Sequence, residues 1–170
     1  MDIAVFSDNR LILGTLKLRC ALGATGITAA KREGDKATPA GRFALRRVLY
    51  RPDRLAAPQT ALPVAPIRAG DGWCDAPGDP QYNKPVTLPY AAGHERLWRE
   101  DHLYDIVVVL GYNDAPPVAG KGSAIFMHVA RPGYAPTEGC VALALPDLKA
   151  VLARCGPGDC IHIHAGTAED

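Results

Sequence analysis

Short apolar runs separated by glycine and proline are the feature that most constrains how this chain folds. The chain has 15 prolines and 17 glycines, and they lie between the apolar runs rather than in one segment. Both residues favour turns, and proline cannot donate a hydrogen bond within a sheet. Such spacing is typical of many short strands joined by turns. The sequence therefore predicts a mainly β protein.

The apolar runs also indicate where the strands lie. Strands are expected at residues 2–6, 11–13, 16–22, 40–50, 106–110, 123–129, 140–143 and 160–164. The run at 106–110 is wholly apolar and rich in β-branched residues, which is typical of a central strand covered on both faces. Residues 51–95 hold eight of the prolines. We expect them to form either a long loop region or strands interrupted by proline.

One helix is predicted in the C-terminal half. Pro146 suits the first helical position, where the N–H that proline lacks would have no partner. Apolar residues then recur at helical spacing and predict one buried face: Leu148, Val151, Leu152 and Cys155. The Gly-Pro-Gly sequence at 156–158 ends the helix.

Length and charge exclude several classes of protein. A chain of 170 residues fits one domain, which we expect to span residues 1–170. Its 19 basic and 18 acidic side chains nearly cancel, whereas a nucleic-acid-binding domain has a basic surplus. No run approaches the ~20 apolar residues of a membrane helix, and no signal peptide is visible at the amino terminus. We therefore expect no nucleic-acid partner and no membrane span.

Cys140 and His128 are the candidate reactive residues. The chain has five cysteines, an odd number, so at least one is free unless it pairs between chains. Cys140 follows a polar, proline-rich loop that begins at the end of the predicted strand carrying His128. A nearby histidine is expected to lower the pKa of the thiol and later to protonate the leaving amine. Gly139 gives the backbone access to substrate, and the amides of Gly139 and Cys140 are expected to stabilise an oxyanion. The competing interpretation is a buried, unreactive cysteine beside a core histidine.

Two segments resemble the YkuD family of L,D-transpeptidases. The step Thr137-Glu138-Gly139-Cys140, with His128 upstream, is similar to the family's catalytic step. Residues 38–43, Thr-Pro-Ala-Gly-Arg-Phe, are similar to its Thr-Pro-x-Gly-x-Phe strand. The resemblance covers residues 10–164. It implies a YkuD-like catalytic domain with sandwich-like or barrel-like sheets and one helix.

The resemblance also implies the roles of the site residues. Cys140 is the nucleophile, His128 is the base, and Gly139 with Cys140 supplies the oxyanion amides. Thr137 shapes the loop and helps to hold the histidine. No metal and no cofactor are needed. The partners are peptidoglycan stem peptides, as donor and acceptor, and carbapenem β-lactams as covalent inhibitors. This substrate makes a periplasmic or cell-envelope location the expectation.

One departure from the family pattern bears on the product. The second residue after the cysteine, often Arg or Asn in the family, is Ala142 here. We therefore expect a donor subsite in which Arg131 supplies the fixed charge. The hypothesis is a 1-3 cross-link between L-alanine and diaminopimelate, with the 3-3 diaminopimelate cross-link as the alternative. Hydrolysis by an L,D-carboxypeptidase or endopeptidase and a non-catalytic wall-binding domain remain as rival functions.

Five residues are candidates for binding substrate: Arg131, Thr137, Tyr112, Asn113 and His94. The planar fork of Arg131 suits a carboxylate, although a solvated loop arginine is the alternative. Tyr112 and Asn113 follow the strand at 106–110 and are expected at its end, where an asparagine also serves as a turn residue. His94 lies in the irregular region and either forms a wall of the cleft or anchors a loop.

Two further groups of residues are expected to have no catalytic role. Lys31, Glu33 and Asp35 are interpreted as a charged turn before Thr38. Cys155, Cys160, His162 and His164 are residue types that bind zinc, and the last three share one face of the last strand. No second ligand pair at zinc-finger spacing accompanies them, so we expect the histidines to face solvent instead of binding a metal.

Overall fold

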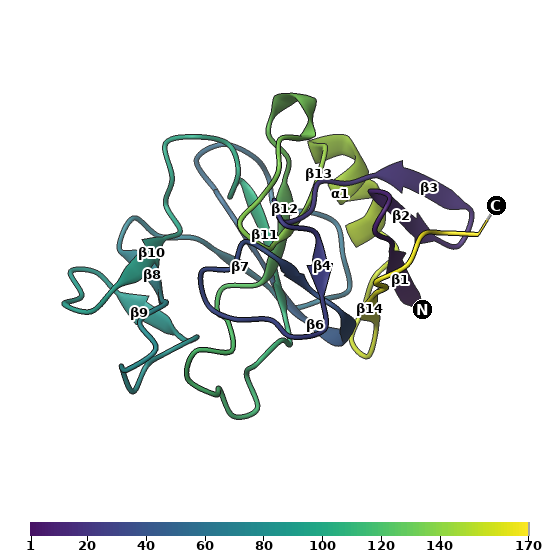
Figure 1. Ribbon diagram of the computed structural model, residues 1–170. Coiled ribbons are helices and arrows are strands. Elements are labelled where there is room, and N and C mark those ends of the chain that lie inside the picture. Colours follow the sequence, from purple (N-terminus) through teal and green to yellow (C-terminus); the bar gives the residue numbers. More distant parts are fainter. Residues whose placement is uncertain (170) are drawn as a thin grey trace.

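One curved sheet dominates the computed structural model, which describes residues 1–169 (Figure 1). Its strands are β1 (Asp2–Val5), β2 (Arg10–Leu13), β3 (Leu16–Arg19), β6 (Gly41–Tyr50), β7 (Val64–Pro66), β11 (Ile106–Leu110), β12 (Phe126–Val129), β13 (Val141–Leu143) and β14 (Cys160–Ile163). The described residues include one α-helix, α1 (Leu145–Leu152), and a 3-10 turn at Pro132–Tyr134. The prediction of a mainly β protein with one helix is confirmed.

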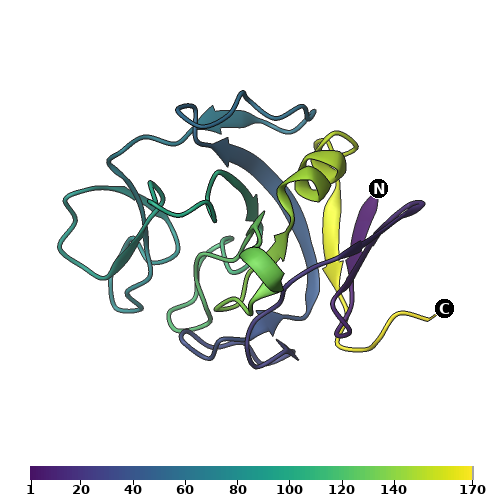
Figure 2. The ribbon, with the colours of Figure 1, turned by 90° about the horizontal axis from the view of Figure 1, so that it is seen from above.

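The main sheet is nearly closed and barrel-like. Its strands follow the order β13-β12-β11-β6-β14-β1-β2-β3, and β7 pairs with β6 at the side. The ten-residue strand β6 joins the two halves, because Leu45–Tyr50 pair with β11 and residues 41–44 pair with β14. Figure 2 shows β6 as a long curved strand beside β14 and β1. β12 and β13 pair in parallel, which places the starts of both strands at the same edge of the sheet.

The strand β11 contributes to the core on both of its faces. Successive side chains on a strand point to opposite faces. Val108 accordingly packs in the cluster that includes Met127 and the α1 residue Leu148. Val107 and Val109 pack in a second cluster with Phe126. The prediction of a doubly covered central strand is confirmed.

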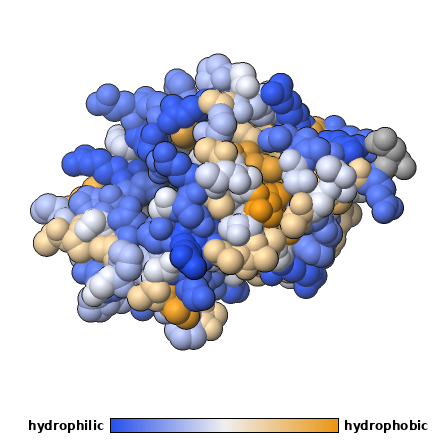
Figure 3. Space-filling view, in the orientation of Figure 1, coloured by the Kyte–Doolittle hydropathy of each residue, from blue (hydrophilic) through white to orange (hydrophobic). Residues whose placement is uncertain are grey.

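The proline-rich segment contains short strands. A three-stranded sheet has the order β10-β8-β9, with β8 at Asp71–Cys74, β9 at Pro85–Thr87 and β10 at His94–Arg96. This small sheet lies on the side of the molecule opposite the chain termini (Figure 1), where hydrophilic side chains dominate the visible surface (Figure 3). The sequence left two interpretations open for residues 51–95, a long loop region or strands interrupted by proline. The second describes the structure better. A two-stranded sheet of β4 (Ile27–Thr28) and β5 (Thr38–Pro39) completes the fold.

Several predicted boundaries differ from the structure. The helix begins at Leu145, so Pro146 is its second residue, and it ends at Leu152, so Cys155 is buried just beyond it. The strand expected at 123–129 begins only at Phe126. Ala124 takes a φ of +52°, which is incompatible with a strand and keeps residues 123–125 in a loop. No helix among the described residues is long and apolar enough to cross a membrane.

Candidate active site

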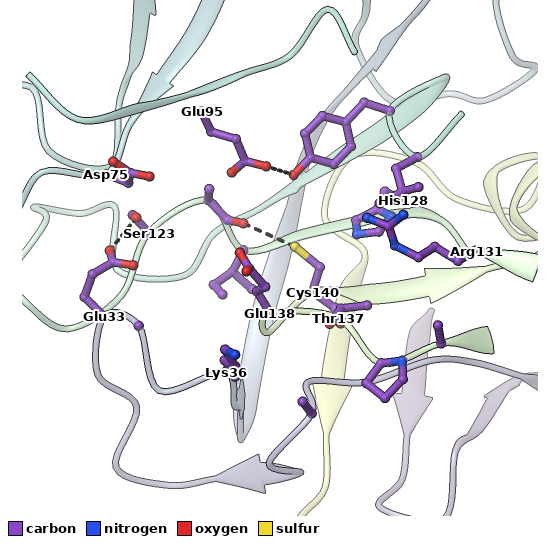
Figure 4. Close-up of a pocket in the computed structure, with 18 of the residues that line it drawn as sticks. Glu33, Lys36, Asp75, Glu95, Ser123, His128, Arg131, Thr137, Glu138 and Cys140 are labelled. Carbon is purple, nitrogen blue, oxygen red and sulfur yellow. Dashed lines mark hydrogen bonds between the residues drawn. The ribbon is translucent and has the colours of Figure 1, made fainter. Parts of the chain in front are cut away.

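Two neighbouring strands bring Cys140 and His128 together. His128 lies opposite Ala142 in the parallel pair β12–β13. Cys140 precedes Ala142 by two residues, so the alternation of side chains directs Cys140 to the same face as His128. Both side chains line one cavity of about 670 Å³. Figure 4 shows the sulfur between a group of carboxylates and the side chains of His128 and Arg131.

The thiol is held by the backbone of the loop before β12. Cys140 Sγ donates to the carbonyl oxygen of Ala124 over 3.3 Å, and the amide of Phe126 lies 3.4 Å from the sulfur. The buried Asn83 fixes this loop, because its Oδ1 accepts from the amide of Ala124 at 3.0 Å and from Trp73 Nε1 at 2.9 Å. Only 9% of Cys140 is exposed, on the side of the cavity.

The imidazole of His128 is oriented by its own strand. Nδ1 lies 2.8 Å from the carbonyl oxygen of Val129. A carbonyl oxygen only accepts, so Nδ1 carries the proton and Nε2 has a free lone pair. The ring of Tyr104 packs edge-on against the imidazole, with 5.3 Å between centroids. This arrangement leaves Nε2 as the nitrogen that can accept a proton.

Burial favours the uncharged forms of Cys140 and His128. It raises the pKa of the Cys140 thiol to about 12, and the charge of Glu95 acts in the same direction. It lowers the pKa of His128 to about 4. The expectation that the histidine lowers the thiol pKa is therefore wrong for this state, because the loss of hydration outweighs the neighbouring dipoles. At neutral pH the cavity therefore holds a thiol and an uncharged imidazole.

The loop before Cys140 is organised by the hydroxyl of Thr137. Thr137 Oγ1 accepts from the amide of Gly139 at 3.1 Å and donates to the carbonyl oxygen of Cys140 at 2.7 Å. The predicted role of Thr137 in shaping the loop agrees with these bonds, but His128 is held by Val129 instead. Gly139 has a φ of +140°, and a Cβ there would lie 2.7 Å from the carbonyl oxygen of Ala37. Only glycine fits this position.

The Gly139 amide is not free to bind an oxyanion, contrary to the prediction. Its N–H is engaged by Thr137 Oγ1 within the loop. An oxyanion donor must point at the developing charge. Since the Gly139 amide points at Thr137, the Cys140 amide is the one left of the two predicted donors.

Charged side chains line the cavity on several sides. The acidic ones are Glu33, Asp75, Glu95 and Glu138, and the basic ones are Lys31, Lys36, Arg99 and Arg131. Glu33 accepts hydrogen bonds from Tyr82 at 2.7 Å and Ser123 at 2.5 Å. The buried Lys31 pairs with Asp35 at 2.5 Å. Residues 33–35 form the turn that the sequence predicts, and Lys31 and Glu33 also line the cavity, which the sequence did not indicate.

Glu95 approaches the site from the small sheet. It lies opposite Trp73 in the β8–β10 pair and accepts a hydrogen bond from the hydroxyl of Tyr104. Burial raises the pKa of this carboxyl to about 6. Glu95, Tyr104 and Arg99 were not among the predicted site residues, although all three line the cavity.

Three predicted binding residues lie outside the cavity lining. His94 neighbours Glu95 on β10, so alternation turns it away, and its Nδ1 bonds to the carbonyl oxygen of Ala92 at 2.8 Å. Tyr112 packs edge-on against Phe43 and donates to a loop carbonyl.

Asn113 is a turn residue, as its alternative interpretation held. Its side chain bonds to the backbone of Val118 and Gly122. Arg131 and Thr137, by contrast, do line the cavity. Of the five predicted binding residues, these two are at the site.

The remaining cysteines and histidines, all within residues 1–169, are not grouped as the ligands of a metal ion would be. All five cysteines are free thiols. Within residues 1–169, no three His, Cys, Asp or Glu side chains are grouped as metal ligands would be. The rings of His162 and His164 lie against each other at a tilt of 35°, with their centroids 3.7 Å apart.

Comparison with known proteins gives the family. The family model of the YkuD L,D-transpeptidase catalytic domain matches residues 3–163. Searches of the curated proteins and of the solved structures found no match. The matched range contains the barrel-like sheet, the helix and the cavity with Cys140 and His128. The chain belongs to the YkuD family of L,D-transpeptidase catalytic domains.

Proposed function

We propose that this chain is a peptidoglycan L,D-transpeptidase that uses Cys140 as its nucleophile and His128 as its general base. Membership of the family makes peptidoglycan the substrate. One observation carries the residue assignment: a thiol and an imidazole with a free Nε2 share one face of β12–β13 and line one cavity. A nucleophile and a base in one accessible cavity are the minimum for covalent acyl transfer.

The first half-reaction forms a thioester. The Cys140 sulfur attacks a peptide carbonyl of the donor stem as His128 Nε2 takes the thiol proton. The Cys140 amide donates to the oxyanion of the tetrahedral intermediate. The intermediate then expels the amine, which receives the proton from His128, and the donor remains on the sulfur.

The second half-reaction passes the acyl group to an amine of a second stem. Attack by the amine displaces the Cys140 sulfur, which recovers its proton from His128. Attack by water in place of the amine gives the L,D-carboxypeptidase or endopeptidase activity. Arg131 lies at the cavity and supports the binding of a stem carboxylate. We propose that the product is the 1-3 cross-link, with the 3-3 cross-link as the alternative outcome.

The site of action follows from the substrate. Peptidoglycan lies outside the cytoplasmic membrane, so we propose that the protein works in the periplasm or cell envelope. Protease accessibility of a tagged chain in intact and permeabilised cells tests this proposal.

The decisive experiment incubates the protein with purified muropeptides and identifies the products by mass spectrometry. Cys140→Ala should form no cross-link. Cys160→Ala is the matched control, because Cys160 lies on β14 away from the cavity and should not affect turnover. Equal activity of wild type and Cys140→Ala would refute the proposed nucleophile.

A carbapenem provides an independent test of the thiol. It should add its mass to wild type and to Cys160→Ala, but not to Cys140→Ala. A protein that gives no adduct and no product would instead be a non-catalytic wall-binding domain. Free peptide without dimers would indicate hydrolysis.

A further inference from the structure

The transfer step needs one more proton acceptor than the Cys140–His128 pair provides. An amine with the pKa of a lysine side chain, about 10.4, arrives at neutral pH as an ammonium ion. An ammonium has no lone pair, so it loses one proton before it attacks and a second as the amide forms. His128 takes the second proton and returns it to the sulfur. With Nδ1 already protonated and bonded to Val129, the ring holds only one proton at Nε2.

Glu95 is placed to take the other proton. Its carboxyl lines the same cavity as the thiol, and one of its oxygens accepts from the hydroxyl of Tyr104. The ring of Tyr104 in turn packs on His128. Among the charged groups that act on the Cys140 thiol, Glu95 has the largest influence. The nucleophile, the base and this carboxyl therefore form one cluster.

The other carboxylates of the cavity are less suited to this task. Glu33 is already bonded to two hydroxyl groups, those of Tyr82 and Ser123. Asp75 and Glu95 are both half-buried, but Glu95 is bonded to Tyr104, whose ring packs on His128. Glu138 is exposed, so its carboxylate stays hydrated. In the view of Figure 4, Glu95 and Glu138 lie nearer the sulfur of Cys140 than Asp75 and Glu33 do.

Resting on the proposed transpeptidase function, we propose that Glu95 is a catalytic residue that removes the first proton from the ammonium group of the acceptor stem. The proton moves from the ammonium nitrogen to a Glu95 oxygen, which gives a neutral amine and a neutral carboxyl. The amine attacks the thioester carbonyl and passes its second proton to His128 Nε2. The carbon–sulfur bond breaks, the sulfur takes the proton from His128, and Glu95 releases its proton to water.

The surroundings of Glu95 favour this exchange. Burial is the main cause of its raised pKa, and the charges of Asp75 and Glu138 act in the same direction. The Tyr104 hydroxyl and the charge of Arg99 oppose them. Arg99 is partly neutralised by its pairing with Asp101 at 2.7 Å. An arriving ammonium thus meets an incompletely hydrated carboxylate, which attracts both its charge and its proton.

Glu95→Gln tests the proposal with the two half-reactions measured separately. The amide oxygen still accepts from Tyr104, but glutamine cannot take a proton at neutral pH. The rate at which a carbapenem adds to Cys140, read by mass spectrometry, should stay within about threefold. Transfer of the acyl group to a diaminopimelate side-chain amine at pH 7 should fall by a factor on the order of 100.

The pH profile separates proton removal from a structural effect. In wild type, transfer should rise through pH 6 and then level off. In Glu95→Gln it should keep rising about tenfold per pH unit to about pH 9, because only solvent then supplies the free amine. An acceptor with an α-amine, whose pKa is about 8, should be much less sensitive to the substitution.

Three outcomes would overturn the proposal. The first is a Glu95→Gln variant whose transfer rate and pH profile match those of wild type. The second is a Glu95→Gln variant that loses adduct formation and transfer equally, and the third is an Asp75→Asn variant with the same steeper pH profile as Glu95→Gln. The last would indicate a general effect of negative charge. Failure of the transpeptidase function itself looks different, since wild type would then form no acyl-enzyme on Cys140.

Discussion

The imidazole of His128 donates its Nδ1 proton to the carbonyl oxygen of Val129, its neighbour in β12. This bond fixes the tautomer without any side-chain carboxylate. Burial of the ring then keeps it neutral far below its usual range. His128 can therefore accept a proton at neutral pH, whereas Cys140 is held in its thiol form.

Acylation should therefore be insensitive to pH on the acid side. Its rate with a carbapenem should stay constant from pH 8 to about pH 5 and fall below about pH 4. A protonated His128 cannot accept the thiol proton, and its pKa is about 4. Quenched-flow mass spectrometry gives the rate. A fall centred near pH 6.5 would contradict the buried, neutral state of this ring.

The same residue should make the fold less stable in acid. The folded-state pKa of His128, about 4, lies below its ordinary value of 6.5, so the unfolded chain takes up the proton first. The contribution of His128 to the free energy of unfolding is complete above pH 6.5 and is lost as the pH falls through 4. The loss amounts to about 3 kcal/mol. Urea unfolding should show this loss in wild type and a weaker one in His128→Gln. His102→Gln is the control, because the His102 side chain is 77% exposed.

Gly139→Ala should cost stability and activity together. The new Cβ would lie 2.7 Å from the carbonyl oxygen of Ala37, at a φ of +140°. Gly133→Ala is a matched control, because it also has a positive φ, +74°, but no atom within 4 Å of the new Cβ. We expect a loss of about 3 kcal/mol at 139 and about 1 kcal/mol at 133, measured by urea unfolding. Equal losses would mean that the close contact with Ala37 has no effect.

Thr137→Val should loosen the loop that carries the nucleophile. Valine keeps the shape but removes the bonds to the Gly139 amide and the Cys140 carbonyl. Unfolding should become easier by about 2 kcal/mol, and adduct formation on Cys140 should slow about tenfold. Thr137→Ser retains the hydroxyl and should behave nearly as wild type. If serine and valine have the same effect, the methyl group and not the hydroxyl is what matters.

Local sequence features singled out two residues, Cys140 and His128, that the structure places in one cavity. The apolar run of β11 and the Thr137–Cys140 step are contiguous, so their meaning does not depend on distant pairing. Gly139 was also singled out, although its amide points to Thr137 instead of the cavity. What the sequence conveys well is the chemistry of the residues near the nucleophile in the chain.

The cavity wall depended on long-range pairing and was mostly missed. Glu95 and His94 are neighbours, and on a three-residue strand no pattern shows which of the two faces inward. The β8–β10 register, with Glu95 opposite Trp73, decides it. Lys31 resembled a turn residue because nothing local shows that its segment folds back beside Gly139. Which side chains face the cavity in these segments can be known only from the tertiary fold.

The protonated state of Cys140 has a consequence for how the protein survives chemical stress. Peroxide and simple alkylating reagents react with the sulfur anion, and a thiol with a pKa of about 12 offers them almost none. We therefore expect small, unselective electrophiles to spare Cys140. Under the proposed function, it should react with compounds that occupy the cavity and bring their carbonyl group near His128.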